Sequence, residues 1–499
     1  MNAQESADCL VIGGGIGGLA AAIRTAARGR KVIICEKNDH LGGKCDFRSM
    51  DGFHFDIGPS VLTLPFVLDD LFQSVGADRR DFLEIEPVEP GCSYFFGDGS
   101  RFDAPGTMDD FEQAVAEIFP SEIDGFIRFR AYVRRLWEVS GPAFLFHPPG
   151  MAAARSIPWL RALRALPDFL PGRMEPRLRR YFRDPRLLQL FSRFATYNGS
   201  DPFQTPAIFN VVAYAELAFG SWRCRGGMTA LIRALEQLAS RVGVQVRTNA
   251  EVSRVLFNPE KRVTGALLSD GSSIAAKSIV CNQDAAQARA GPLLAEHPRH
   301  LSWKRKLANQ EASSSGFVVL AALRNSHPDL SCHNVFFPKE YRAEFDSLFD
   351  RPRPLEDPTL YISRPSSLDS ELAPAGKEGW FVLVNAPSLQ KFQDWSEEKY
   401  AQHVLARIEE RYPPCKGNVE WTLFHGPAFY RDSYHAWHGS LYGPSSNPLR
   451  QAFLRFPNRD RHCRGLFFAG GSAHPGGGIP LTLLSGGFAA EYCDNFLGK

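Results

Sequence analysis

The sequence predicts an α/β protein whose parallel sheet begins within its first twelve residues. Residues 10–12 form a short apolar run, as expected of a buried parallel strand. Gly13, Gly15 and Gly18 follow with the spacing G-x-G-x-x-G, and small residues then continue as a helix. A second apolar run comes next, at residues 31–35. Strand, glycine turn, helix and strand together predict a Rossmann-type dinucleotide-binding domain.

Each glycine of this turn has a physical role. Gly13 permits the tight turn, Gly15 lets the backbone approach a pyrophosphate, and Gly18 lets the helix pack closely on the strand. Glu36 ends the second strand, 18 residues after Gly18, where it can accept hydrogen bonds from a ribose 2′-hydroxyl. Its charge disfavours the 2′-phosphate of NADP. The alternative, a glycine turn and an unrelated surface glutamate, leaves the surrounding pattern unexplained.

Composition excludes several classes of protein. The chain of 499 residues is long enough for two or three domains, and its net charge of +2 argues against a general nucleic-acid-binding protein. Ten scattered cysteines with no C-x-x-C pair are typical of buried thiols in a reducing compartment. We find neither the basic start of a signal peptide nor an apolar run of spanning length, and we expect a cytoplasmic protein.

Four motifs spread over both ends of the chain carry a resemblance. They are GGGIGGLAAA, EKNDHLGGKC, DGFHFDIGPS and, over residues 467–487, FFAGGSAHPGGGIPLTLLSGG. Together with residues 195–197 and 226–228, they resemble the flavin-dependent carotenoid desaturases, whose best-known members are the bacterial-type phytoene desaturases. The resemblance implies that the dinucleotide is FAD. The C-terminal motif is most similar to the hydroxycarotenoid (methoxyneurosporene-type) 3,4-desaturases.

The resemblance extends the predicted FAD site beyond the first turn. Its motifs place six further residues beside the cofactor: Lys37, Gly42, Gly43, Lys44, Gly58 and Pro59. Val252, on a strand that re-enters the domain, is expected to meet the adenine end through its backbone. Gly470, Gly471 and Ile479 open the last helix, whose N-terminus suits the ribityl and flavin end. Many FAD oxidoreductases carry an aspartate where Gly471 stands, so the ribityl contact must come from elsewhere.

We therefore predict a glutathione-reductase-like, two-dinucleotide-fold flavoprotein with an interleaved α+β substrate domain and a helical membrane-facing segment. The FAD-binding domain is discontinuous and comprises residues 1–70, 221–300 and 460–499. The substrate-binding domain comprises residues 71–150, 195–220 and 301–459. Between them, residues 151–194 form an arginine-rich lid or membrane-association segment.

The arginine-rich segment has ten arginines, at 155, 161, 164, 173, 177, 179, 180, 183, 186 and 193, against three acids. A basic face beside an apolar face suits a helix lying on an anionic membrane. A solvated, salt-bridged lid is the alternative. Five prolines divide the segment into short helices, which excludes a membrane span. The resemblance favours the membrane surface, because the family takes long apolar substrates from lipid.

The resemblance implies an FAD-dependent desaturase that introduces C=C bonds into an acyclic carotenoid or apocarotenoid polyene by hydride transfer to flavin. A flavin can store two electrons, which no side chain can. Glu216 and His474 are candidate bases for the accompanying proton, although a turn histidine packed under its own helix is the alternative for His474. No second cofactor fingerprint is present, so a membrane quinone or dioxygen is the expected electron acceptor.

Other functions remain open at this point. A flavin amine oxidase or a polyene isomerase would use the same fold, and so would a non-catalytic prenyl-binding escort protein. The intact glycine set with Glu36 speaks against the escort protein. We predict no metal site, because His425, His435 and His438 lack a completing cysteine or carboxylate and stand among aromatic residues. We expect peripheral association with the inner face of the membrane and no nucleic-acid partner.

Overall fold

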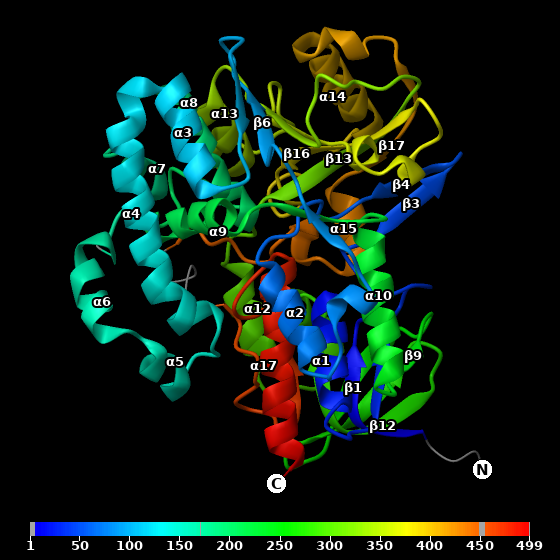
Figure 1. Cartoon of the computed structure of the whole chain (residues 1–499). Coiled ribbons are helices and arrows are strands. Elements are labelled where there is room, and N and C mark those ends of the chain that lie inside the picture. Colours follow the sequence, from blue (N-terminus) through cyan, green and yellow to red (C-terminus); the bar gives the residue numbers. More distant parts are fainter. Residues whose placement is uncertain (1–4, 170, 449–454, 499) are drawn as a thin grey trace.

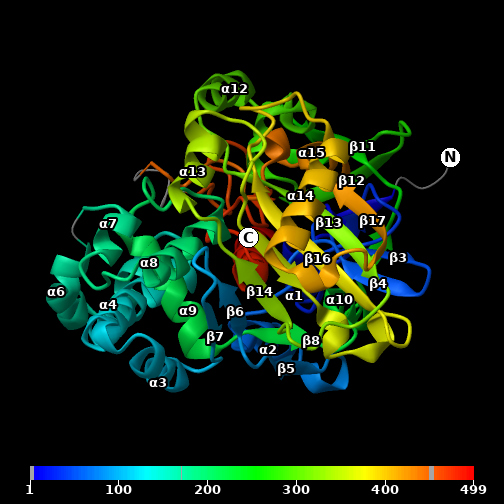
Figure 2. The ribbon, with the colours of Figure 1, turned by 90° about the horizontal axis from the view of Figure 1, so that it is seen from above.

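The computed structural model describes residues 5–169, 171–448 and 455–498, and their side chains other than those at 151, 152, 164 and 166. The side chain of Arg164 thus lies outside the described residues, as do residues 1–4 and 499 of the predicted FAD-binding domain, 170 of the arginine-rich segment and 449–454 of the predicted substrate-binding domain. Two sheets lie one above the other, and a helical lobe stands beside them (Figure 1). Figure 2 shows the same lobe from above, next to the second sheet.

The first sheet is built from segments far apart in the sequence. Its order is β10-β11-β12-β1-β2-β9, and β18 also pairs with β12. The pairs among β9, β2, β1, β12 and β18 are parallel, whereas β10, β11 and β12 pair antiparallel. The bounds are β1 (Ser6–Ile12), β2 (Val32–Cys35), β9 (Gln245–Arg247), β10 (Val252–Phe257), β11 (Val263–Leu268), β12 (Ser273–Cys281) and β18 (Leu466–Phe468).

Both faces of this sheet are covered, which explains its continuous apolar runs. Cys9 and Val11 of β1 face a core formed with four helices, whereas Leu10 and Ile12 face the opposite core. The four helices are α1 (Ile16–Ala26), α2 (Pro65–Gln73), α10 (Met228–Arg241) and α17 (Ile479–Leu497). The opposite core is closed by α11 (Ala285–Ala290) and α12 (His300–Ala308).

The second sheet has the order β17-β13-β16-β15-β14-β6-β7 and is antiparallel except between β14 and β6. Its bounds are β6 (Cys92–Phe95), β7 (Arg101–Ala104), β13 (Ser315–Leu323), β14 (His333–Phe336), β15 (Leu360–Ser363), β16 (Glu378–Ala386) and β17 (Val419–His425). Helix α14 (Glu397–Arg411) packs on one face. The other face meets the ribbon β3 (Phe47–Met50) and β4 (Phe53–Asp56), which leads back to the first sheet. A short ribbon, β5 (Ile85–Pro87) with β8 (Trp222–Cys224), completes the strands described.

The helical lobe surrounds an aromatic core that includes Phe126, Phe129 and Phe191. Its helices are α3 (Met108–Ile118), α4 (Ile123–Ser140), α5 (Met151–Ser156), α6 (Trp159–Ala165), α7 (Met174–Leu178), α8 (Pro185–Ser192) and α9 (Val211–Phe219). Two further helices, α13 (Tyr341–Phe345) and α15 (Pro427–Tyr434), flank the second sheet. Among the helices in the described ranges, none combines the length and the hydropathy needed to cross a bilayer.

Candidate active site

Two glycine-rich turns from opposite ends of the chain meet at one edge of the first sheet. Cys281 of β12 pairs with Ile12 of β1 on one side and with Phe468 of β18 on the other. The carboxyl ends of three parallel strands therefore lie together, which is where open α/β sheets bind ligands. The turns touch, because a Cβ on Gly17 would lie 2.8 Å from the Gly470 nitrogen. A cavity of about 630 Å³ opens beside both turns.

The first turn excludes side chains yet leaves backbone N–H groups available. A Cβ on Gly18 would lie 2.2 Å from the Gly13 oxygen, and one on Gly15 would lie 2.9 Å from Nδ2 of Asn282. Within the described chain, no side chain caps the first turn of α1, whose N-cap is Gly15. Uncapped N–H groups at a helix N-terminus bind anions. The turn therefore fits a pyrophosphate.

Glu36 presents a carboxylate to the same cavity. Its Oε2 accepts a hydrogen bond from the Gly14 N–H at 2.7 Å, and its Oε1 accepts one from the Asn38 N–H at 2.9 Å. Each oxygen keeps a second lone pair, so the fixed carboxylate can also accept hydroxyl hydrogens. Lys37 and Val252 line the cavity nearby, and Lys37 Nζ donates to the backbone carbonyl oxygen of Asp432 at 2.5 Å. This end fits a ribose.

A second loop lies directly on the first turn. The Gly42 N–H donates to the Gly14 oxygen at 3.0 Å, and a Cβ on Gly43 would lie 3.2 Å from the Gly15 Cα. Gly42 and Gly43 have φ angles of +120° and +59°, a region that favours glycine. The two loops together form this part of the cavity wall from backbone atoms alone.

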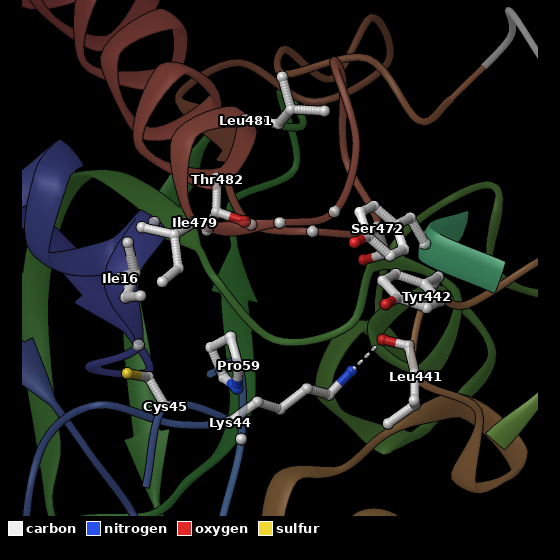
Figure 3. Close-up of a pocket in the computed structure, with 18 of the residues that line it drawn as sticks. Ile16, Lys44, Cys45, Pro59, Leu441, Tyr442, Ser472, Ile479, Leu481 and Thr482 are labelled. Atoms are coloured by element: carbon white, nitrogen blue, oxygen red, sulfur yellow. Dashed lines mark hydrogen bonds between the residues drawn. The ribbon is translucent and has the colours of Figure 1, made fainter. Parts of the chain in front are cut away.

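Lys44 and Pro59 form the next part of the wall. Lys44 Nζ donates to the Leu441 oxygen at 2.6 Å across the cavity (Figure 3). Burial lowers the pKa of Lys44, and the charge of Asp284 opposes that effect. The backbone at Gly58 lies directly against the backbone of Lys44, because a Cβ on Gly58 would lie 1.8 Å from the Lys44 carbonyl oxygen. The ammonium group thus stays inside the cavity at a fixed position.

The second turn closes the other side. Gly470, Gly471 and Ile479 line the cavity, and Figure 3 shows Ile479 opposite Pro59 and Lys44. α17 starts after its N-cap Gly478, again without a side-chain cap from the described residues. The positive end of a second helix therefore faces the cavity that the first one faces. Two uncapped helix ends, a fixed carboxylate and walls of bare backbone fit an elongated dinucleotide.

The structure brings the predicted cofactor residues together. All of them except Gly18 line the cavity, and Gly18 packs behind the turn against Gly13. The sequence analysis missed Asn282, whose Nδ2 donates to the Gly13 oxygen at 3.3 Å. A signal existed, because Asn282 directly follows the buried strand β12 at the ligand-binding edge of the sheet.

The two candidate bases lie behind the cavity surface. Glu216 accepts a hydrogen bond from the Tyr197 hydroxyl at 2.5 Å and pairs with Arg193 at 3.5 Å. Arg193 and Tyr197 themselves line the cavity. His474 is 1% exposed, and its Nε2 donates to the His147 oxygen at 3.1 Å. Burial lowers the pKa of His474. Both side chains are thus engaged with protein partners.

A row of hydrogen-bonded groups that the sequence analysis missed does reach the cavity. The Ser60 and Tyr361 hydroxyls lie 2.6 Å apart, and the Tyr361 hydroxyl lies 2.9 Å from Nδ1 of His333. Ser60 and Tyr361 line the cavity, and His333 is buried behind them. Burial and the nearby charge of Arg193 lower the pKa of His333 to about 4, so the ring is neutral and one of its nitrogens can accept a hydrogen. No sequence motif marks these residues, because three separate segments supply them.

The remainder of the cavity wall is largely apolar. It comes from α4 and the residues after it, from α9 and the residues before it, and from β16 of the second sheet. It includes Trp137, Phe144, Leu145, Ile208, Phe209, Val211, Val212, Phe381 and Leu383. Of the aromatic residues near His425, His435 and His438, Tyr430, Tyr434 and Tyr442 line the cavity. The cavity therefore continues from a polar, glycine-walled part into an apolar channel.

One group of potential metal ligands occurs among the described residues, away from the cavity. His297, Asp460 and Cys463 have ligand atoms within 4.8 Å of one another. The Arg299 N–H donates to Nδ1 of His297 at 3.0 Å, and Nε2 of that ring faces Asp460 at 3.3 Å. Hydrogen bonds engage both ring nitrogens, so the cluster is explained without an ion.

Comparison with known proteins gives consistent relatives. Residues 16–493 match the family of flavin-containing amine oxidoreductases. The chain is 34% identical over 498 residues to a 1-hydroxycarotenoid 3,4-desaturase of Flavobacterium sp., covering 97% of this chain and 99% of that protein. It is 30% identical over 504 residues to a lycopene-forming phytoene desaturase of Paracoccus sp., covering 98% of each.

Solved structures share the fold at lower identity. Putrescine oxidase bound to putrescine matches with a TM-score of 0.65 and 14% identity, covering 99% of both chains. Cyclohexylamine oxidase from Brevibacterium oxydans matches with a TM-score of 0.64 and 15% identity, covering 99% of this chain and 100% of that one. These likenesses establish a mixed α/β fold of the flavin amine oxidase type.

Proposed function

The chain belongs to the flavin-containing amine oxidoreductases and, within them, to the carotenoid desaturases, and we propose that it desaturates an acyclic carotenoid or apocarotenoid. It is an FAD-dependent oxidoreductase, as its motifs predicted. One observation carries the proposed substrate: the glycine-walled cavity continues without interruption into an apolar channel. A long polyene buries its surface there, and apolar burial is the main source of affinity for such a ligand.

The chain supplies binding, orientation and a dry environment. FAD, when bound, supplies the chemistry of accepting a hydride and storing two electrons. Gly15, Glu36 and the N-terminus of α1 would hold its adenosine diphosphate half, and the N-terminus of α17 would lie at its flavin half. The uncapped N–H groups of α17 favour negative charge at that end. The apolar wall excludes water from the reacting carbons.

The proton that leaves the polyene needs an acceptor on the cavity surface. We assign this role to the Ser60 oxygen, which takes the proton as its own hydrogen passes to Tyr361 and the Tyr361 hydrogen passes to Nδ1 of His333, where the proton ends. With His333 in the tautomer that leaves Nδ1 unprotonated, Tyr361 donates to Nδ1 and Ser60 donates to Tyr361, so the Ser60 oxygen can accept the proton. A weak acceptor suffices, because loss of this proton extends the conjugation of the product. Glu216 then acts as the buried partner of Arg193 rather than as the base.

The comparisons favour a desaturase over the other functions considered. The relatives with at least 30% identity include desaturases, whereas the amine oxidases match at 14 and 15%. A guanine-nucleotide dissociation inhibitor of Rab proteins from Plasmodium falciparum matches with a TM-score of 0.52 at 12% identity. The intact glycine turn and the fixed Glu36 oppose an escort function without cofactor. Within the desaturases, the C-terminal motif favours the hydroxycarotenoid 3,4-branch.

A peripheral position on the inner face of the membrane fits the exposed surface of the arginine-rich segment. Trp159, Leu160 and Leu163 of α6 are 62, 79 and 62% exposed, and Arg155 and Arg161 beside them are exposed too. Apolar side chains flanked by arginines suit an anionic lipid surface. The segment follows Phe144 and Leu145, which line the cavity, so substrate would enter from lipid. A membrane quinone or dioxygen would reoxidise the cofactor.

The decisive test is anaerobic mixing of the purified yellow protein with acyclic polyenes. We expect the absorption of oxidised flavin to disappear in proportion to polyene added, and the recovered pigment to absorb at longer wavelength. A protein whose flavin is reduced by amines and not by any acyclic polyene would contradict the proposed function. An amine oxidase would give that pattern.

A further inference from the structure

Four aromatic rings from four separate segments meet beside the apolar channel. They belong to Phe66 of α2, Trp137 of α4, Phe146 beyond the end of α4, and Phe219 of α9. The ring centroids lie 6.0 Å apart for Phe66 and Phe146, 6.2 Å for Phe146 and Trp137, 5.2 Å for Trp137 and Phe219, and 5.5 Å for Phe219 and Phe66. The four contacts close on themselves, and we call this group the aromatic circle.

The aromatic circle reaches from the channel to the protein surface. Trp137 lines the cavity, whereas Phe66, on the opposite side of the circle, is 41% exposed. Phe146 and Phe219 are half-buried between these two rings. Leu145, the neighbour of Phe146, also lines the cavity. A continuous path of aromatic surface therefore joins the inside of the channel to its outside.

The circle joins two parts of the fold that have separate cores. α2 packs against the first sheet through Val67 and Leu68, whereas α4 packs inside the helical lobe through Phe126 and Phe129 (Figure 1). The contacts of Phe66 with rings of the lobe are apolar and therefore non-directional. Such contacts can separate and close again without leaving a polar group unpaired.

The segment that carries Phe146 has an unusual helical form. Gly141–Leu145 make a π-helical turn, in which the Phe146 N–H donates to the Gly141 oxygen at 3.2 Å. Such turns occur frequently at functional sites. A Cβ on Gly141 would lie 3.6 Å from the Trp137 ring and 3.7 Å from the Phe146 ring. The π turn thus brings Phe146 back to the end of α4 and closes the circle there.

We propose that the aromatic circle is the portal through which the polyene enters and leaves the channel, by separation of Phe66 from Phe146. An apolar chain can pass between these rings because neither surface loses a hydrogen bond to water. Phe146 also leads into the arginine-rich segment, whose exposed side chains on α6 we place at the lipid surface. This inference rests on the proposed function and deepens it by locating the entry of the substrate.

A chemical bridge across the portal tests this inference. In the double variant Phe66→Cys/Phe146→Cys, a short bis-maleimide joins the two new thiols, and the ten native cysteines are all buried. The holoprotein is mixed with a fully conjugated acyclic polyene, and the shift of its absorption band reports uptake. We expect uptake to fall in proportion to the fraction of bridged protein, with unchanged flavin absorption. Polyene bound before bridging should stay bound through gel filtration.

The two single variants are the matched controls for the bridge. Phe66→Cys and Phe146→Cys each carry the same reagent attached at one end, which adds similar bulk without joining the two segments. Both should take up the polyene and release it on gel filtration. The comparison separates closure of the portal from the bulk of the reagent.

The variant Phe66→Ala opens the portal instead. Its ring is exposed, so the fold is expected to persist. We expect polyene entry and exit both to become about fivefold faster, from loss of ring contacts that keep the portal closed, while the dissociation constant stays unchanged. A portal changes both rates equally, whereas a binding residue changes the equilibrium. Leu368→Ala is the control, because Leu368 is 45% exposed and does not line the cavity, and its rates should match wild type.

The outcomes separate this inference from the proposed function. Free uptake and release by the bridged protein would overturn the portal and place the entry elsewhere. A bridged protein that neither takes up polyene nor retains polyene bound beforehand would also overturn it, because the bridge would then act on the binding site. A wild-type protein that binds no acyclic polyene would reject the proposed function itself.

Discussion

The two ends of the cavity are built in opposite ways. At the cofactor end, backbone forms the wall, and glycines such as Gly15 and Gly43 bring loops within contact of each other. At the polyene end, side chains form the wall, and they come from different parts of the fold: Arg193 from the helical lobe, and Tyr361 and Asn385 from two strands of the second sheet. A backbone wall recognises what every dinucleotide shares, whereas a side-chain wall can be changed residue by residue. The difference suits a fixed cofactor and a variable substrate.

The largest effect should come from filling the backbone wall. In Gly18→Ala the new Cβ would lie 2.2 Å from the Gly13 oxygen, so the turn must move. We expect FAD affinity to fall by a factor on the order of 100, from overpacking of about 3 kcal/mol. Titration of cofactor-free protein with FAD measures it. Gly487→Ala on α17 is the control, since its nearest contact would be Arg24 at 3.4 Å. Unchanged affinity in Gly18→Ala would contradict the backbone wall.

Lowering the pH should destabilise the fold through His333, which lies behind the polyene end of the cavity. Burial and Arg193 lower the pKa of His333 to about 4, whereas an unfolded histidine titrates near 6.5. Between these values the unfolded chain binds a proton that the folded chain does not, so stability falls as the pH falls below about 6.5. We expect His333 to lower the free energy of unfolding by about 2 kcal/mol between pH 7 and pH 5.

Urea unfolding at both pH values, in wild type and in His333→Gln, measures this contribution. The glutamine can still accept the Tyr361 hydrogen, and other titrating groups are common to both proteins. The wild type should therefore lose more stability than the variant. Identical losses would show that His333 is not held neutral in the fold.

A smaller effect is expected for the hydroxyl row. Tyr361→Phe breaks the connection between Ser60 and His333 without changing the backbone wall. We expect about a tenfold fall in kcat, below the usual range for a general base because the departing proton is acidic. The flavin content of the purified protein should equal that of wild type. A loss of flavin instead of turnover would mean that the two ends are not independent.

The smallest effect concerns the exposed apolar side chains of α6. Leu160→Glu puts a charge on a side chain that is 79% exposed. We expect about fivefold weaker sedimentation with anionic vesicles, from loss of about 1 kcal/mol of apolar burial, and unchanged flavin content. Leu301→Glu, 68% exposed on α12, is the control and should bind vesicles like wild type. Equal weakening in both variants would argue against a specific contact of α6 with lipid.

The same contrast explains what could be predicted from the sequence. The turn at Gly13–Gly18 and its partner Glu36 lie within one βαβ unit, so local spacing reveals them. The strand predicted at residues 31–35 corresponds to β2, and the predicted last helix corresponds to α17. Both could be predicted because each is a nearly continuous run of apolar and small residues. The hairpin of β6 and β7 can also be read from the sequence, because an Asp-Gly turn marks it.

The polyene end escaped prediction for a physical reason. Arg193 is one of ten arginines in its segment, and only the fold turns it inward toward Tyr94. His333 and Tyr361 lie on neighbouring strands, yet no spacing in the chain relates them to Ser60. Glu216 and His474 were natural candidates by residue type, but their surroundings tie them to Arg193 and to the His147 carbonyl. Side-chain chemistry alone does not reveal orientation.

The close approach of Gly17 and Gly470 has a consequence for biosynthesis. The nucleotide pocket needs β18 beside β12, and α17 packed where a Cβ on Gly486 would lie 2.4 Å from the Gly17 oxygen. A ribosome makes that strand and helix about 450 residues after the first turn. The nascent polypeptide therefore cannot close this pocket around its coenzyme until that strand and helix have been made.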